Sequence, residues 1–393
     1  MSAPARFVPF AYGFRPFFLL AGLYAFVAVA AWLWLFPAGP TIGNGVPPQL
    51  WHGHEMIFGF IAAAIAGFML TAVPSWTGGR GFAGNPLKLL VLLWVIGRLA
   101  MSFAGFLPWQ FVVVAELAFL PAVIATLAPS LLGKRSRNTP LLVVLFAFWV
   151  ADATFLAGLA RQDVALASTA LRAALNLALV LITVIGGRIV PAFTANALRA
   201  RGQDPGIRSR RPLEIAAIAG TVAYGVSDVV APQHAVTASM AAFAAIAHVL
   251  RFAGWQSHRT LRMPILWVLH LAYFWLPLGL AMKSLYAGFG ASWAAHWLHA
   301  LGAGAAGMMI LAVMTRAALG HTGRPLEVRP VIAFAYVLLA AAVLVRVFGP
   351  ALMPAGYVAT LMLAGGAWLA AFLLYLGVYA PILTRPRADG RPG

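Results

Sequence analysis

The chain carries a succession of apolar stretches of about 20 residues, the length of helix that crosses the hydrocarbon core of a bilayer. A membrane-embedded segment that pairs with no neighbouring strand can satisfy its backbone hydrogen bonds only as a helix. The sequence therefore predicts an all-α, polytopic integral membrane protein with about 12 transmembrane helices. The stretches fall near residues 17 to 36, 53 to 73, 87 to 106, 109 to 131, 140 to 160, 166 to 190, 212 to 231, 234 to 252, 264 to 286, 293 to 315, 331 to 349 and 355 to 379.

The composition agrees with a protein dissolved in lipid. Hydrophobic residues make up 62% of the 393 residues and charged residues only 9%, which a water-exposed surface could not accommodate. Cysteine is absent, so disulfides, thiolate metal sites and iron–sulfur clusters are excluded. A transition metal would therefore depend on the nine histidines. No phosphate-binding loop is found, which disfavours transport driven by ATP.

The positive charges indicate the orientation in the membrane. The formal net charge of +18 could suggest nucleic acid, but the Lys and Arg residues collect in alternate connections between the apolar stretches, and the intervening connections hold almost only Arg161. Because positively charged loops remain in the cytoplasm, we predict that both termini are cytoplasmic and that nucleic acid is not a partner. No connection is long enough to fold alone, so residues 1–393 are predicted to form a single transmembrane domain.

A weak internal repeat is found when the chain is shifted by about 245 residues. The shift superposes His54 on His299, Gly59 on Gly304 and Met69 on Met314. Both segments enter the membrane from the same side, so the shift predicts an internal parallel repeat. The alternative is chance matching between alanine-rich helices.

Four histidines lie near the predicted periplasmic ends of the second and tenth spans. A spacing of three places His52 with Glu55, and His296 with His299, on one helical face. His54 would point elsewhere unless the first turn is irregular. Imidazole suits copper, and a carboxylate can orient the ring. We therefore predict a copper site among these histidines, supported by Glu55; the alternative is a helix end rich in hydrogen bonds.

The remaining membrane histidines lie toward the cytoplasm. His248 lies near the inner end of the eighth span and His270 about two turns into the ninth, so the two are predicted to lie at similar depth across a short hairpin. They could form a bis-imidazole site for haem b. Two unrelated histidines bonded to carbonyl groups or water are a nearly equal alternative. His321, just past the tenth span, could provide a further metal contact or cap its helix.

Charged residues inside the spans form two predicted pairs. Arg98 and Glu116 are mirror positions about the turn between the third and fourth spans, and Asp152 and Arg172 are mirror positions about the next periplasmic turn. Each pair should meet at one depth. Neutralisation of charge is favoured over proton transfer as the role of both pairs.

Four motifs are spread along the chain. They are Phe14-Arg15-Pro16-Phe17-Phe18-Leu19, Trp51-His52-Gly53-His54-Glu55, Thr71-Ala72-Val73-Pro74-Ser75-Trp76-Thr77-Gly78 and Met314-Thr315-Arg316-Ala317 with Leu319-Gly320-His321-Thr322-Gly323-Arg324. These motifs resemble those of the NnrS family, and the resemblance covers essentially the whole chain. It implies a twelve-span protein of the bacterial inner membrane that carries haem and copper and is linked to nitric oxide metabolism and nitrosative stress. The family's histidines map onto His52, His54, His248, His270, His299 and His321.

Two functional hypotheses follow. The leading one is a haem- and copper-binding protein that binds or processes nitric oxide, with an electron donor as a partner where the chemistry is redox. The rival is a permease for a metal or metal–nitrosyl complex, with histidines as transit ligands. The sequence does not decide whether the protein is an enzyme, and a structural or assembly role is a third hypothesis.

Overall fold

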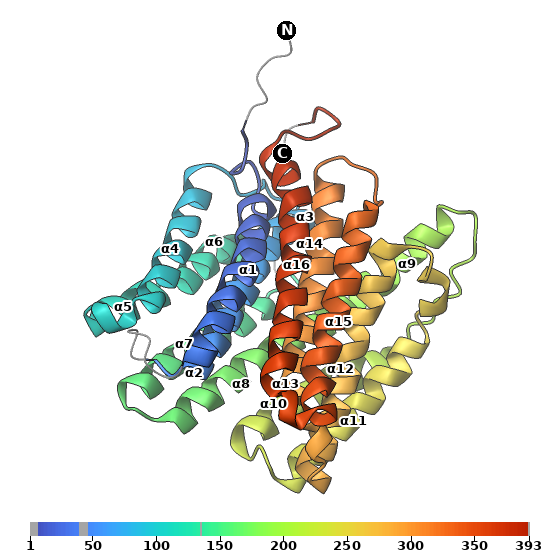
Figure 1. Cartoon of the computed structure of the whole chain (residues 1–393). Helices are drawn as coiled ribbons and strands as arrows, with labels where there is room; N and C mark the ends of the chain where they lie inside the picture. Colours follow the sequence, from blue (N-terminus) through green and yellow to red (C-terminus); the bar gives the residue numbers. More distant parts are fainter. Residues whose placement is uncertain (1–6, 39–45, 134–135, 392–393) are drawn as a thin grey trace. The chain divides into compact units, whose positions relative to one another are not determined.

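The computed structural model describes residues 7–38, 46–133 and 136–391. Within these residues all regular elements are helices (Figure 1). Twelve helical segments are long and apolar enough to cross a membrane. The predicted all-α fold and number of spans are therefore confirmed. The spans are Phe14–Phe36, Pro48–Thr77, Asn85–Ser102, Trp109–Gly133, Pro140–Ala160, Val164–Arg199, Arg211–Val230, Ala235–Ala253, Pro264–Phe289, Ser292–His321, Pro330–Leu352 and Pro354–Thr384.

Several spans are broken into consecutive helical elements. The principal elements are α1 (Phe14–Ala38), α2 (Pro48–His54), η1 (Glu55–Ile61), α3 (Ala62–Thr77), α4 (Asn85–Ser102), α5 (Trp109–Leu117), α6 (Phe119–Gly133), α7 (Pro140–Ala160), α8 (Val164–Leu181), η3 (Ile182–Gly186), α9 (Gly187–Arg199), α10 (Arg211–Val230), α11 (Ala235–Ala253), α12 (Pro264–Phe289), α13 (Trp297–His299), η6 (Ala300–Gly307), α14 (Met308–His321), α15 (Pro330–Leu352) and α16 (Tyr357–Thr384). Short 3-10 turns are η2 (Ala104–Phe106), η4 (Ser257–Thr260), η5 (Ser292–Ala294) and η7 (Pro354–Gly356).

Proline and glycine mark helix ends. Helices α2, α4, α7, α10, α12 and α15 each have proline at the first or second position, where a backbone N–H would have no helical partner anyway. Helices α3 and α12 end at Gly78 and Gly290, whose φ angles are +62° and +66°. Glycine adopts this left-handed conformation without a steric penalty.

In the part of the chain that the structure describes, three spans contain a π-helical segment, namely η1, η3 and η6. A π turn interrupts the regular ladder and leaves a carbonyl group available to another donor. In η1 the carbonyl of Gly59 accepts from the Trp94 indole at 3.2 Å. In η3 the carbonyl of Thr183 accepts from Arg251 Nη1 at 2.8 Å. Side chains on other helices therefore stabilise both segments.

The π segments agree with the predicted parallel repeat. Shifted by the 245 residues that superpose His54 on His299, the first residue of η1 falls on Ala300, where η6 begins. The two spans concerned, Pro48–Thr77 and Ser292–His321, both contain 30 residues. The two matched helices therefore share an irregularity as well as a length.

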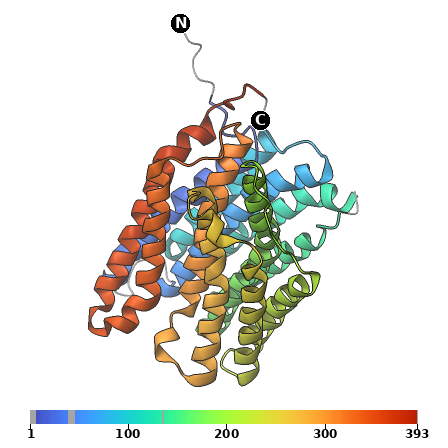
Figure 2. The ribbon, with the colours of Figure 1, turned by 90° about the vertical axis from the view of Figure 1, so that its right-hand side faces the viewer.

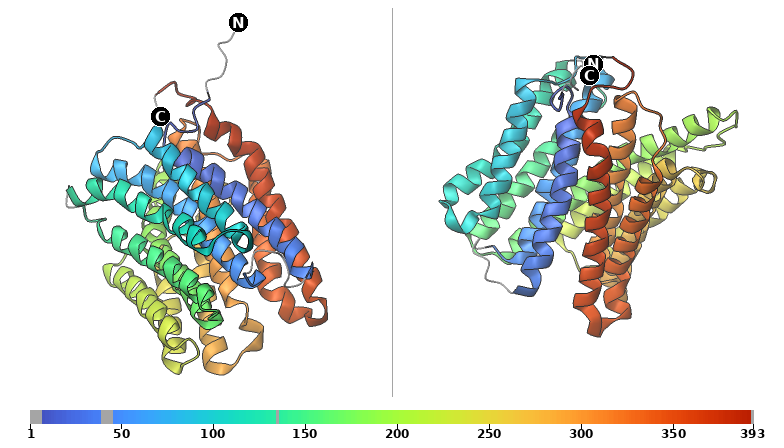
Figure 3. Two further views of the ribbon diagram at one scale, coloured as in Figure 1. Left: turned by 90° about the vertical axis from the view of Figure 1, so that its left-hand side faces the viewer. Right: turned by 45° about the horizontal axis from the view of Figure 1, so that its top comes forward.

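The described residues group into two compact units, and the single transmembrane domain stays a prediction. Unit 1 contains the described residues of 1–174, 317–325 and 372–393, and unit 2 contains residues 175–316 and 326–371. In unit 1, α1 contacts α3 and η1, and α4 to α7 lie side by side (Figure 3, left). In unit 2, α10, α11 and α12 follow one another as neighbours (Figure 2).

In unit 1, the first helix contacts the end of the last helix. The buried Arg15 donates from Nη1 to the carbonyls of Leu383 and Arg385, at 3.0 and 2.7 Å. Leu383 lies in the last turn of α16 and Arg385 directly follows the helix, at the end where the helix dipole is negative. The following residues, 385–391, form a C-terminal tail in which Arg387 donates to the carbonyl of His321 at 2.8 Å. The N-terminal helix, the last helix and the end of α14 are thus tied together.

Candidate metal centre

His54 lies in unit 1 where α2 passes into η1, and its side chain is fully buried. Its Nδ1 atom is 2.8 Å from Oε1 of Glu55, the next residue. The predicted pairing of Glu55 with His52 assumed a regular α-helix. The π turn changes the direction of the side chains, so His54 meets Glu55, while the His52 ring stacks on Trp32 with a centroid distance of 4.6 Å.

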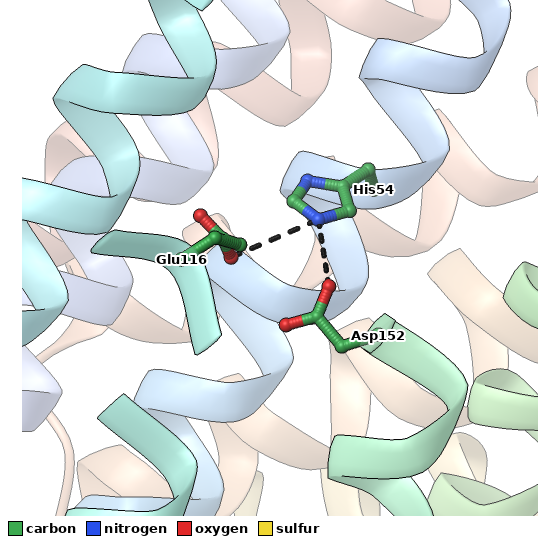
Figure 4. A group of neighbouring side chains, drawn as sticks. All are labelled: His54, Glu116 and Asp152. Atoms are coloured by element: carbon green, nitrogen blue, oxygen red, sulfur yellow. Dashed lines mark hydrogen bonds and ion pairs between the residues drawn. The ribbon is translucent and has the colours of Figure 1, made fainter. Parts of the chain in front are cut away.

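Two further carboxylates face the other nitrogen of His54 (Figure 4). The Nε2 atom lies 3.1 Å from Asp152 Oδ1 on α7 and 3.7 Å from Glu116 Oε1 on α5. Ligand atoms of the three residues all lie within 4.8 Å of one another, and all three side chains are buried. Three helices therefore bring one imidazole and two carboxylates to a single point.

The predicted pair of Arg98 and Glu116 is confirmed as an ion pair through Arg98 Nη2 and Glu116 Oε1. Arg98 also donates from Nη1 to both oxygens of Glu55, at 2.9 Å each. The Tyr24 hydroxyl donates to Glu55 Oε2. One guanidinium therefore holds two carboxylates in place beside His54.

The cluster carries more negative than positive charge. Glu55, Glu116 and Asp152 contribute three carboxylates and Arg98 one guanidinium, which leaves −2 when His54 is neutral. The buried Oε2 atom of Glu116 makes no hydrogen bond within the described residues. Uncompensated charge is costly in a membrane interior, so the arrangement favours a bound cation. A divalent ion would bring the total to zero.

The hydrogen bonds also suit metal binding by His54. When Nδ1–H donates to Glu55, the lone pair of Nε2 points toward the oxygens of Asp152 and Glu116. Only a proton or a cation can make that approach favourable. A metal-binding histidine commonly donates its other N–H to a carboxylate, which fixes the ring orientation. Imidazole nitrogen with carboxylate oxygen suits divalent transition metals, including Cu²⁺.

Comparison with protein families decides the identity of the chain. The model of the NnrS protein family matches residues 8–387. The chain belongs to the NnrS family. The resemblance predicted from the motifs is therefore confirmed. No curated protein matches the chain.

The haem site predicted from the sequence depends on His248 and His270, so the hydrogen bonds of their rings matter. Arg251 can only donate, so the Tyr273 hydroxyl accepts from Arg251 Nη1 at 3.0 Å and donates to His248 Nδ1 at 2.7 Å. His248 Nε2 lies 2.9 Å from Thr221 Oγ1, whose hydrogen is given to the carbonyl of Ala217. In this arrangement Nε2 donates to Thr221 and the lone pair of Nδ1 accepts from Tyr273, so both nitrogens of His248 are engaged.

His270 is held in the same way. Its Nε2 lies 2.8 Å from Thr194 Oγ1, which donates to the carbonyl of Val190, so Nε2 again carries the proton. Its Nδ1 accepts from Ser257 Oγ at 2.8 Å. Because hydroxyl groups occupy all four ring nitrogens, His248 and His270 do not fit the axial positions of a haem. This finding favours the alternative reading of the pair, as unrelated histidines, although their partners are hydroxyl groups.

The other predicted site residues lie elsewhere. His296 Nδ1 lies 3.4 Å from Arg346 Nη1, and its ring is 6.3 Å from that of His299. A guanidinium beside the imidazole disfavours a metal cation there, contrary to the predicted role of His296. The His321 ring lies against Phe14 and Tyr12.

The predicted partner of Asp152 was Arg172. The structure instead places Asp152 against His54, while Arg172 donates to Thr169 of its own helix at 2.8 Å. Mirror positions about a turn share a depth in the membrane. They need not share a direction around the helix axis, and the helical phase of α7 turns Asp152 toward η1.

Other buried polar residues were not predicted. Tyr24 belongs to the cluster in unit 1. In unit 2, Arg251 pairs with Glu214, and Lys283 Nζ lies 2.7 Å from Asp228. The sequence does contain a signal for the charged residues, because a charge inside or at the end of an apolar span indicates a partner or a function.

Proposed function

We propose that this NnrS-family protein binds a divalent metal, copper by the family's chemistry, at His54, Glu116 and Asp152, and binds or processes nitric oxide to protect against nitrosative stress. The observation that carries the metal assignment is the excess negative charge around a buried imidazole, with Glu116 Oε2 lacking a hydrogen bond in the described residues. The bound metal would supply a coordination position for nitric oxide.

The protein's own residues keep the site ready for a cation. Glu55 orients the His54 ring through Nδ1, and Arg98 holds Glu55 and Glu116. All of these side chains are buried within unit 1. A small neutral molecule that dissolves in lipid can reach such a site more easily than an ion can, since a charge must lose its hydration to enter.

The proposal assigns no haem to His248 and His270, because their nitrogens are already engaged. Haem in this protein would need other ligands. We also propose that the chain is a multi-pass protein of the bacterial inner membrane with both termini in the cytoplasm, as the Lys and Arg distribution supports. A reporter after residue 393 should then be active only in the cytoplasm, and one near Arg161 only in the periplasm.

Metal analysis of the purified protein tests the function. Full-length protein extracted in mild detergent should contain one copper per chain, and nitric oxide should change its electron paramagnetic resonance spectrum. The Glu116→Gln and Asp152→Asn variants should lose the copper and the response. Full copper occupancy in both variants would contradict the site. Wild-type protein that retains no copper, but carries it across vesicle membranes, would instead support the permease hypothesis.

A further inference from the structure

Arg346 is the only charged residue of α15, and it lies half-buried in unit 2. Its nearest polar partners are His296 Nδ1, at 3.4 Å from Nη1, and the Tyr357 hydroxyl, at 3.5 Å from Nη2. Both distances are at the upper limit for a hydrogen bond. Within the described residues, no carboxylate forms an ion pair with Arg346. The guanidinium is therefore only loosely satisfied.

Two other buried cations of the same unit do have acidic partners. Arg251 pairs with Glu214, and Lys283 pairs with Asp228, so these acidic side chains are already engaged. A charge inside a membrane protein that lacks a counterion is costly, and such residues commonly mark a ligand or a path. An anion that is not part of the chain can therefore neutralise the guanidinium of Arg346.

The groups around Arg346 are suited to an anion. Arginine cannot accept a hydrogen bond, so His296 Nδ1 accepts, and the neutral ring then carries its proton on Nε2. The Tyr357 hydroxyl accepts from Arg346 Nη2. The guanidinium has a planar array of donors that matches the two oxygens of a carboxylate, nitrite or phosphate group. Among the residues that the structure describes, the surroundings thus offer donors and a positive charge, but no carboxylate in an ion pair with Arg346.

We propose that Arg346, His296 and Tyr357 bind an oxyanion. His296 directly precedes α13 and Tyr357 begins α16, so the site lies where spans begin, at the level of lipid headgroups. The oxyanion is either the phosphate of a phospholipid or a small soluble ion. The inference concerns unit 2 and does not depend on metal binding in unit 1.

Two binding measurements on full-length protein distinguish the sources. Native mass spectrometry of detergent-extracted protein reports retained phosphatidylglycerol, and calorimetric titration of delipidated protein reports binding of sodium nitrite or inorganic phosphate. We expect Arg346→Gln to weaken the binding seen in one arm by about tenfold or more, since charge-assisted hydrogen bonds are lost. Tyr357→Phe should weaken it by a smaller factor.

Arg316→Gln is the matched control, because Arg316 is another half-buried arginine of unit 2 whose guanidinium lies 3.3 Å from the centre of the Phe193 ring. It should leave the binding unchanged. Unaltered size-exclusion behaviour and metal content would show that Arg346→Gln folds. The proposal is overturned when wild-type protein holds no anion in either arm, or when folded Arg346→Gln binds as tightly as wild type.

Discussion

The Nε2 atom of His54 lies 3.1 Å from Oδ1 of Asp152, although 98 positions separate the two residues in the chain. The opposite ring nitrogen is engaged by Glu55, at 2.8 Å. His54 therefore stands between two carboxylates, in a buried cluster that already contains more negative than positive charge. A proton on Nε2 reduces this excess by one charge, whereas a divalent metal removes it.

Asp152→Asn should lower copper content well below one ion per chain, because an amide oxygen is a weaker ligand and carries no charge. Glu116→Gln should act in the same direction. Elemental analysis of purified protein is the measurement. Glu327→Gln, at an exposed position, is the control and should leave copper unchanged. Normal copper in Asp152→Asn would show that the cluster is balanced by protons.

Arg98→Leu should destabilise the protein more than Arg98→Leu combined with Glu116→Leu. Removing one partner of a buried ion pair costs about 3–5 kcal/mol, and Arg98 neutralises both Glu55 and Glu116. The single variant leaves both Glu55 and Glu116 without a counterion. The double variant leaves only Glu55 without one. Thermal unfolding in detergent and the amount of protein in the membrane report the difference. Equal losses in the two variants would count against the pairing.

Haem, where it accompanies the purified protein, should keep its absorption spectrum in His248→Gln and His270→Gln. Neither ring offers a nitrogen lone pair in the hydrogen-bonded arrangement described above. Both variants should instead lower stability, by about 1–3 kcal/mol for each buried partner left unsatisfied. A change of haem spin state in either variant would show that the ring is an axial ligand.

Gly187→Ala should destabilise unit 2, because a Cβ atom at this position would collide with the guanidinium of Arg251. Arg251 would then lose its contacts with Thr183 and Glu214. Gly366→Ala is the matched control, since a Cβ there meets no atom of the described residues within 4 Å. Thermal unfolding should show a loss in the first variant alone, and equal behaviour of the two would refute the role of Gly187.

The C-terminal tail should loosen in acid. Arg387 donates to both oxygens of Asp389, at 2.9 and 2.6 Å, and thereby lowers the pKa of that carboxyl group. A lowered pKa in the folded state means that the carboxylate stabilises the tail above the unfolded pKa of about 3.9. This stabilisation is lost as the pH falls below that value through the folded pKa.

The absence of cysteine allows a spin label at a single site, Ala388→Cys, to report the mobility of the tail. Mobility should be low at pH 7 and should rise as the pH is lowered below 4. With Asp389→Asn added, mobility should be high and independent of pH over the same range. A wild-type tail that stays immobile at the lowest pH would show that Asp389 does not hold it.

The sequence by itself determined the number of spans and the presence of charged residues that need partners. Both follow from one physical condition, that backbone and charged groups must be satisfied locally in a medium without water. It also determined the pairing of Arg98 with Glu116, because a short turn between antiparallel helices brings mirror positions to the same depth. The family motifs are short runs of consecutive residues, so they too could be recognised from the sequence alone.

Only the tertiary structure decided which side chains form the candidate metal centre. The π turn at Glu55 changes the helical phase, so that His54 rather than His52 meets Glu55. Asp152 reaches the centre because α7 turns it toward η1 rather than toward Arg172. The hydroxyl groups that occupy His248 and His270 come from residues such as Thr221 and Thr194 on other helices. The direction in which a side chain projects from its helix toward a neighbour depends on how distant segments pack. The spacing of residues along the chain does not determine that packing.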